Sequence, residues 1–181
     1  MIFEEKKTVL KNGKEAILKS PELQDAEKML NYVRQACGET EYLLRYPEEW
    51  NISVEQEKGW VNRNSTSPND LAIACFVDGK VAGNCGIHFE SGIKKAHCAT
   101  IDIAILKDYW NIGIGSAMFK ELIAVARKRG IEIIEIEFIE GNERAKALYE
   151  KFGFKTVCEK PNVIKLKNGT YLKLIYMQKY L

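Results

Sequence analysis

Hydrophobic and polar positions divide the chain into alternating strand-like and helix-like blocks. Residues 100–106 are apolar at almost every position, on both faces of an extended chain, which predicts a strand covered on both sides. Residues 114–128 repeat apolar positions three and four apart, which predicts an amphipathic helix, and Gly130 after three cationic residues predicts its end. Residues 131–139 return to a strand pattern. A helix between two such strands indicates a right-handed parallel crossover.

Three hairpins are predicted from paired strand-like runs around Asn-Gly or Asp-Gly turns. They cover residues 8–18, 71–90 and 163–179, and Asn12-Gly13 in the first hairpin favours a type I′ turn. The first hairpin makes residues 1–14 an N-terminal strand and hairpin extension. A separate strand is expected over residues 96–106.

Helix starts are predicted from capping residues. Ser20, followed by proline, is expected to cap a helix that ends near Gly38. Ser53 and Gln56 are expected to form a capping box at the start of a second helix. With a last helix from about Asn142, the prediction is an α/β (α+β) fold, a mixed central sheet of about seven strands flanked by about four helices.

Length and composition fit one ordinary globular domain over residues 1–181. Apolar residues make up 46% of the chain and charged residues 29%, and the net charge of +2 favours neither nucleic acid nor a membrane as partner. No signal-peptide pattern is present, so a cytoplasmic location is expected. Five cysteines without a C-x-x-C pair and two isolated histidines predict reduced thiols and no metal site.

Gly113 and Gly115 stand where the strand gives way to the helix. The first N–H groups of a helix lack partners and carry partial positive charge, so this junction suits a phosphate. Two glycines at such a junction also occur for tight packing alone, and both interpretations stay open. A Walker loop is excluded because its sequence is absent, and a Rossmann fingerprint is incomplete because Met118 occupies its third position.

Two segments resemble the GNAT acetyltransferase superfamily. Trp110 to Gly115 is similar to its coenzyme A loop, written Q/R-x-x-G-x-G/A, with Trp110 in place of the glutamine or arginine. The Tyr-Trp string before the glycines resembles the branch that includes ribosomal-protein N-terminal acetyltransferases. Residues 142–154 resemble the family segment N-x-x-A-x-x-x-Y-x-K-x-G-F. The resemblance covers residues 15–181.

The resemblance implies the GNAT fold and acetyl-CoA (coenzyme A) as cosubstrate, without a metal. It implies that the strand through residues 103–105 separates from the strand through residues 136–139, and that the pantetheine arm lies between them. The pyrophosphate is expected on backbone N–H groups of the glycine loop. The residues implied in coenzyme binding are Ile103, Ala104, Ile105, Asn111, Ile112, Gly113, Ile114, Gly115, Ser116, Asn142 and Tyr149.

Tyr149 is the expected catalytic acid, since a phenol can protonate the departing thiolate. It also stands on an apolar helix face, where tyrosines often only pack. Asn142 is expected to bind the pantetheine arm, to cap the helix, or both. Many family members use a glutamate near the start of the strand as base, but this chain has Ala99 and Thr100 there. Asp102, Glu137 and a water chain remain as candidates, with Asp102 chosen as tentative base.

The function predicted is an N-acetyltransferase that moves acetyl from acetyl-CoA to a primary amine by direct attack in a ternary complex. The amine is on a small molecule or a peptide, and a homodimer is possible. The alternative is an acyl-CoA-binding regulatory module without turnover; a dinucleotide-dependent oxidoreductase is disfavoured. Residues 38–60, acidic and aromatic, lie over the acceptor site in the family and either recognise an amine or form a solvated loop.

Overall fold

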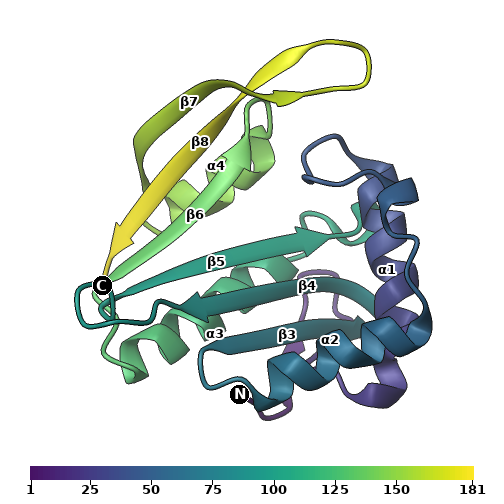
Figure 1. Cartoon of the computed structure of the whole chain (residues 1–181). Coiled ribbons are helices and arrows are strands. Elements are labelled where there is room, and N and C mark those ends of the chain that lie inside the picture. Colours follow the sequence, from purple (N-terminus) through teal and green to yellow (C-terminus); the bar gives the residue numbers. More distant parts are fainter.

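A single mixed sheet of eight strands carries the molecule, with helices on both of its faces (Figure 1). The computed structural model describes residues 1–181. The strand order is β1-β2-β3-β4-β5-β6-β8-β7, and β5–β6 is the only parallel pair, as the crossover predicted. The strand count is one above the expected seven. The strands are β1 Lys6–Val9, β2 Glu15–Lys19, β3 Asp70–Val77, β4 Lys80–Phe89, β5 Cys98–Ile105, β6 Ile133–Ile139, β7 Lys155–Lys165 and β8 Tyr171–Tyr180.

Four α-helices cover the two faces, as expected in number. α1 and α2 pack together over β3 and β4 on one face, whereas α3 packs against β4 and β5 from the other, with α4 on the same side (Figure 1). The larger core lies under α3 and α4, and a smaller one lies under α1. The helices are α1 Ala26–Glu39, α2 Val54–Thr66, α3 Ile114–Lys128 and α4 Glu143–Lys151.

Ser20 does not cap α1, so that prediction is wrong. Its hydroxyl donates to the Ala72 carbonyl (2.8 Å) and accepts from the Phe3 N–H (2.9 Å), which ties the N-terminal segment to β3. A short 3₁₀ turn, Leu23–Asp25, precedes α1 instead. The capping box of Ser53 and Gln56 at the start of α2 is confirmed. A serine can satisfy tertiary as well as helical partners, and sequence alone does not separate the two.

The turns of the first two hairpins differ. Asp78 and Gly79 both have positive φ (50° and 74°), as a type I′ turn requires. In the first hairpin only Gly13 has positive φ (81°), and the Leu10 N–H donates to the Lys14 carbonyl across a longer loop. The type I′ prediction is therefore wrong at the Asn-Gly pair. The longer loop brings Lys11 against the start of α3, where its N–H donates to the Ile112 carbonyl (2.9 Å).

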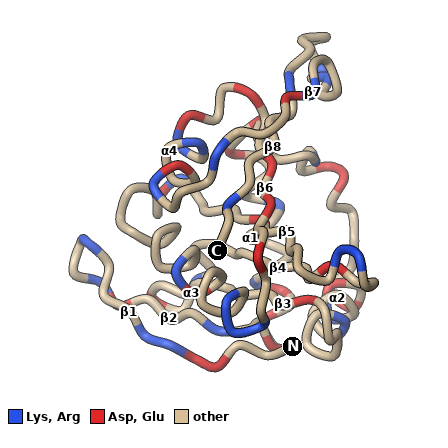
Figure 2. Tube along the Cα trace, turned by 90° about the vertical axis from the view of Figure 1, so that its left-hand side faces the viewer, with Lys and Arg blue, Asp and Glu red and all other residues tan.

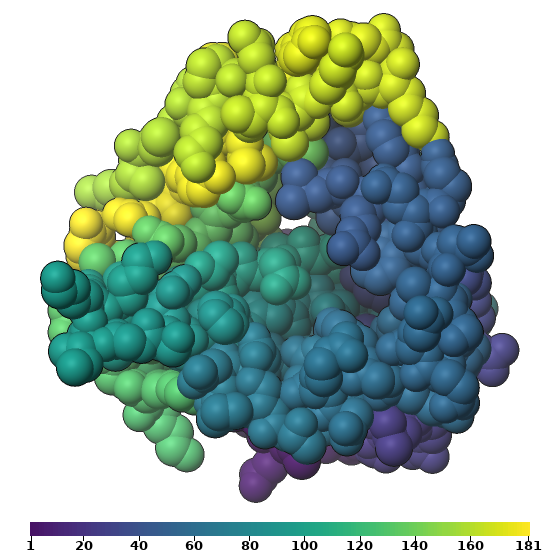
Figure 3. Space-filling view, in the orientation of Figure 1, coloured from purple at the N-terminus to yellow at the C-terminus, as the bar shows by residue number.

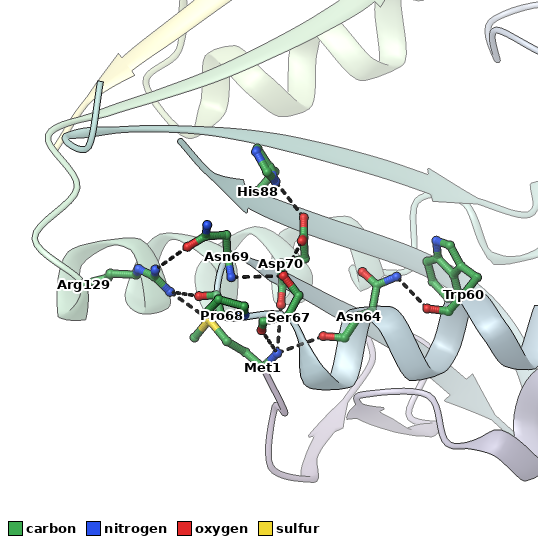
Figure 4. Close-up of polar contacts among 9 residues, drawn as sticks. All are labelled: Met1, Trp60, Asn64, Ser67, Pro68, Asn69, Asp70, His88 and Arg129. Carbon is green, nitrogen blue, oxygen red and sulfur yellow. Dashed lines mark hydrogen bonds and ion pairs between the residues drawn. The ribbon is translucent and has the colours of Figure 1, made fainter. Parts of the chain in front are cut away.

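A polar cluster fixes the end of α2 to the N-terminus and to α3 (Figure 4). The α-ammonium group of Met1 donates to the carbonyls of Asn64 (2.8 Å), Ser67 (2.5 Å) and Asp70 (3.0 Å). The Arg129 guanidinium, at the end of α3, donates to carbonyl and amide oxygens of the same α2–β3 turn. α2 is thus held at its capped start and at its end, so the side chains along it have fixed positions.

The sheet opens between β5 and β6. Their parallel pairing runs only from the Cys98–Ile133 pair to the Thr100–Glu135 pair. Beyond Thr100, β5 stays with β4 and β6 stays with β8, and Figure 1 shows the two strands diverging. This confirms that the strand through residues 103–105 separates from the strand through residues 136–139.

Candidate active site

A cleft of about 1,020 Å³ occupies the opening between the two strands. β5, β6 and α4 form its floor and one wall, and α1, α2 and the connection between them form the other. Figure 3 shows the hollow between the blue α1–α2 segment and the teal strands. The cleft brings together the residues predicted on separate elements, and those that line it are Asp102, Ile103, Ala104, Ile105, Glu137, Asn142 and Tyr149.

The tip of the β7–β8 hairpin bridges to the α1–α2 connection. The Lys167 N–H donates to the Tyr46 hydroxyl (3.0 Å), and the Lys167 ammonium pairs with Glu48. These groups are exposed, so the ion pair adds little stability. The contact joins the two arms that lie on either side of the opened sheet.

Backbone groups of β5 point into the opening. The Leu106 N–H donates to Ala82 (3.0 Å), and the Ala104 carbonyl also faces β4. Because backbone direction alternates along a strand, the N–H and C=O groups of Ile103 and Ile105 face away from β4, toward the space that β6 leaves. Of the three residues predicted to pair with pantetheine, Ile103 and Ile105 therefore present backbone groups to the cleft and Ala104 does not.

Tyr32 holds β4 and β5 at this position, a role the sequence analysis missed. Its hydroxyl donates to the Ala104 carbonyl (2.8 Å) and accepts from the Asn84 N–H (3.1 Å), so the phenol stands within the ladder between paired residues. Burial raises the pKa of Tyr32, so it stays a neutral donor. Nothing in the sequence around one tyrosine on a predicted helix indicates that its hydroxyl will insert between two strands.

The loop before α3 presents a row of free donors. None of the N–H groups of residues 111–116 donates to a protein acceptor. Asn111 (φ 64°) and Gly113 (φ 104°) both have left-handed backbone, which curls the loop around the helix start. Consecutive N–H groups in such a curve at a helix N-terminus form an anion site.

The two loop glycines have different roles. A Cβ on Gly115 would lie 2.9 Å from Leu148 Cδ2 and 3.3 Å from Ile105 Cδ1, so this glycine permits close packing of α3 on α4 and β5. Gly113 needs its positive φ. The Lys11 side chain passes 3.7 Å from the point where a Cβ on Gly113 would lie. Lys11 thus joins the loop from the N-terminal hairpin, a neighbour that sequence reasoning did not anticipate.

Trp110, at the position of the motif's glutamine or arginine, fastens the end of β5. Its indole N–H donates to the Ile105 carbonyl (2.7 Å), and the Arg144 guanidinium lies 3.5 Å above its ring. This stack connects the loop before α3 with the start of α4. A tryptophan can therefore hold this corner of the site through its ring N–H and its π-face.

Tyr149 is set rigidly beside the opening. Its ring stacks on Phe119 (5.5 Å between centroids) and meets Phe138 edge-on (5.8 Å), and the residue is buried. Its hydroxyl has no hydrogen-bond partner in the protein and lines the cleft. Burial, and next the charge of Asp102, raise the pKa of Tyr149, so the phenol keeps its proton. Tyr149 therefore packs in the core, as tyrosines on apolar helix faces often do, and also lines the cleft, as a catalytic acid must.

Asp102 faces the cleft from β5. A Cβ on Gly86, its partner in β4, would lie 2.6 Å from Oδ2, so the carboxylate rests where Gly86 leaves room. Water reaches it through the cleft, but the surrounding protein weakens its hydration and raises the pKa of Asp102. No hydrogen bond or ion pair to a neighbour compensates.

Asn142 caps α4, as predicted. Its Oδ1 accepts from the Ala145 N–H (3.2 Å). Its place on the cleft leaves the predicted contact with the pantetheine arm geometrically open.

The cysteines, the metal-ligating side chains and the surface charges offer no comparable site. All five cysteines are free, and burial raises the pKa of Cys75 to about 12, which suppresses its thiolate. No three His, Cys, Asp or Glu side chains gather as metal ligands, and no helix has the length and apolarity needed to cross a membrane. Figure 2 shows basic and acidic residues interspersed along the chain.

The comparison with protein families gives one match that spans most of the chain. Residues 38–154 match the model described as "Acetyltransferase (GNAT) family". L-amino acid N-acetyltransferase AaaT of Escherichia coli is 24% identical over 90% of this chain and 96% of its own length. [Ribosomal protein bS18]-alanine N-acetyltransferase of Haemophilus influenzae is 32% identical over 44% of this chain and 54% of its own length.

A solved structure shares the fold. YncA of Salmonella typhimurium, a putative acetyltransferase with its cofactor acetyl-CoA, superposes with a TM-score of 0.78. The match covers 92% of this chain and 94% of that one at 17% identity, which supports the fold alone. Both the resemblance and the fold predicted from sequence are confirmed.

Proposed function

This chain belongs to the acetyltransferase (GNAT) family, and on that premise we propose that it transfers acetyl from acetyl-CoA to a primary amine by direct attack in a ternary complex. The observation that carries the proposal is the opening of the sheet beside a row of unpaired N–H groups. The strand edge for the pantetheine arm lines the cleft, and the anion site for the pyrophosphate follows along the chain, directly after the cleft residue Trp110. The family and the Salmonella neighbour's cofactor support acetyl-CoA as the donor.

We assign the coenzyme to backbone groups of residues 103–105, which line the cleft, and of residues 111–116, the loop that continues from the cleft residue Trp110; together they are the coenzyme side. Ile103 offers its N–H and C=O groups to pantetheine, and Ile105 offers its N–H, since the Ile105 carbonyl already accepts the Trp110 indole N–H. One of these N–H groups polarises the thioester carbonyl as negative charge builds on its oxygen. The loop N–H groups hold the pyrophosphate, with Lys11 beside them. Since these donors belong to the backbone, their side chains contribute little directly.

The reaction proceeds by attack of the neutral amine nitrogen on the thioester carbon. A C–N bond forms, the C–S bond breaks, and the nitrogen's proton passes to Asp102. Tyr149 donates its proton to the departing thiolate, and solvent restores both residues. Asp102 suits the base because its pKa is raised and no protein group occupies its oxygens. Tyr149 suits the acid because its hydroxyl is free and protonated.

The experiment compares thiol release from acetyl-CoA by wild type and Tyr149→Phe over a panel of amines. We expect kcat to fall by about 100-fold or more, with acetyl-CoA affinity unchanged, since the phenyl ring keeps its contacts with Phe119. An unchanged kcat would reduce Tyr149 to a packing residue. Calorimetric binding of acetyl-CoA without release of thiol by any amine would favour the binding module without turnover.

A further inference from the structure

Glu57 is a buried carboxylate that the reaction above does not use. It stands on α2, is only 5% exposed, and lines the cleft. Its carboxylate accepts no hydrogen bond and forms no ion pair, and burial raises the pKa of Glu57. No protein group occupies its oxygens and they stay open to the cleft, so this carboxylate is available to a donor that arrives with a ligand.

Two further unpaired acceptors line the same cleft. Asn84 Oδ1 is buried without a partner, and Asp102 on the neighbouring strand has none either. Asn84 lies on β4 opposite Ala104, and Asp102 lies two residues before Ala104 on β5, so both belong to one sheet face. Together with Glu57 they form the amine side of the cleft. All three groups accept hydrogen bonds, so the complementary ligand is rich in donors.

The charge of these groups selects a cation. Two of the three are carboxylates, and Trp60, one turn after Glu57 on α2, adds an aromatic surface that attracts ammonium groups. Three arginines line the cleft as well. Arg45 and Arg144 lie over the rings of Trp50 and Trp110. Arg63, whose charge acts on Glu57, is exposed, and its guanidinium lies within 3.5 Å of the Cβ position of Gly59. A ligand carboxylate on this wall would face Glu57 and Asp102.

From this arrangement we propose that the acetyl acceptor is a diamine or polyamine, whose second ammonium group binds Glu57 while its reacting amine lies at Asp102. This rests on the proposed function and adds the class of its substrate. Asn84 Oδ1 accepts one of the remaining N–H groups. Because the two carboxylates stand on different elements, the distance between the two amines of the ligand is a selective feature.

The test uses acetyl-CoA and three molecules that share a four-carbon chain: butane-1,4-diamine, butan-1-amine and 4-aminobutanoate. We expect kcat/KM for the diamine to exceed that for the monoamine by about 10-fold or more, with 4-aminobutanoate lowest. Glu57→Gln should lower the ratio of kcat/KM for the diamine to that for the monoamine to about 1. Longer diamines then report the preferred separation of the two charges.

Glu55→Gln is the matched control, since Glu55 is exposed on the same helix and pairs with Lys58. It should leave all three values unchanged. Preference for 4-aminobutanoate, or equal losses on diamine and monoamine in Glu57→Gln, would overturn the inference. If Glu57→Gln does not fold, the wild-type ranking of the three molecules still decides. Thiol release with every amine and no ranking overturns only this inference, whereas no release with any amine overturns the proposed function.

Discussion

The two sides of the cleft differ in what they are made of. The coenzyme side presents backbone N–H groups of β5 and the loop before α3 that have no acceptor. The amine side presents the side-chain oxygens of Glu57, Asn84 and Asp102 that have no donor. Backbone sites depend on chain path and tolerate most side-chain changes, whereas side-chain sites change with a single substitution. One fold can therefore keep its coenzyme and vary its amine.

Among substitutions on the amine side, Asp102→Asn is expected to cause the largest loss of activity. It removes the proposed base while keeping the shape of the side chain, so kcat/KM should fall by about 100-fold. In wild type the base works deprotonated, and its raised pKa means that activity falls with decreasing pH already above the usual carboxylate range. A pH–rate profile that keeps this acidic limb in Asp102→Asn would assign the base to another group.

Gly86→Ala tests the same carboxylate without altering it. The new Cβ would lie 2.6 Å from Oδ2, so Asp102 must rotate away. We expect about a 10-fold loss of kcat with unchanged acetyl-CoA affinity, measured by thiol release and calorimetry. Gly59→Ala on α2 is a control, since its Cβ meets only the flexible end of Arg63. Equal losses in both variants would argue against a positioned carboxylate.

Gly115→Ala is expected to disturb the coenzyme side by crowding the packing of α3 on α4 and β5. Its Cβ would press on Leu148 and Ile105, which costs about 1–3 kcal/mol of stability and displaces the loop N–H groups. A chemical denaturation curve and the Kd of acetyl-CoA should both change. If only stability changes, the loop donors do not bind the pyrophosphate.

Lys11→Met tests whether the N-terminal hairpin contributes to binding of acetyl-CoA. We expect about a 3-fold weaker acetyl-CoA affinity, with less dependence on salt, because one exposed cation near the phosphates is lost. Lys14→Met in the same hairpin is the control, since Lys14 pairs with Asp78. A Kd insensitive to both substitutions would separate the hairpin from the coenzyme.

Glu57→Gln should raise stability slightly near neutral pH. The folded-state pKa of Glu57 is above its unfolded value, so the ionised group opposes folding at pH 7 and its protonation favours folding as pH falls. The melting temperature of the variant should exceed that of wild type at pH 7, and the difference should shrink toward pH 4. A lower melting temperature at pH 7 would mean that Glu57 has a stabilising partner.

Local pattern determined much of this molecule by itself. Alternating blocks gave the order of strands and helices, because each block needs one apolar face against the core. Through their resemblance to the GNAT family, the glycine loop and residues 142–154 predicted the helix that carries Tyr149, the helix cap at Asn142 and the loop at the start of α3, since these features depend on short-range spacing. The capping box at Ser53 formed for the same reason.

Tertiary structure decided what depends on residues far apart in the chain. Ser20 bonds to β3 instead of capping α1, and Tyr32 enters the β4–β5 ladder from 52 residues away. Lys11 reaches the loop before α3 only through the bend of its hairpin. In the sequence, Glu57 looks like any other polar residue on a helix. Only the structure shows that it is buried and has no ion-pair partner. Desolvation and hydrogen-bond satisfaction belong to the packed whole, so no local pattern encodes them.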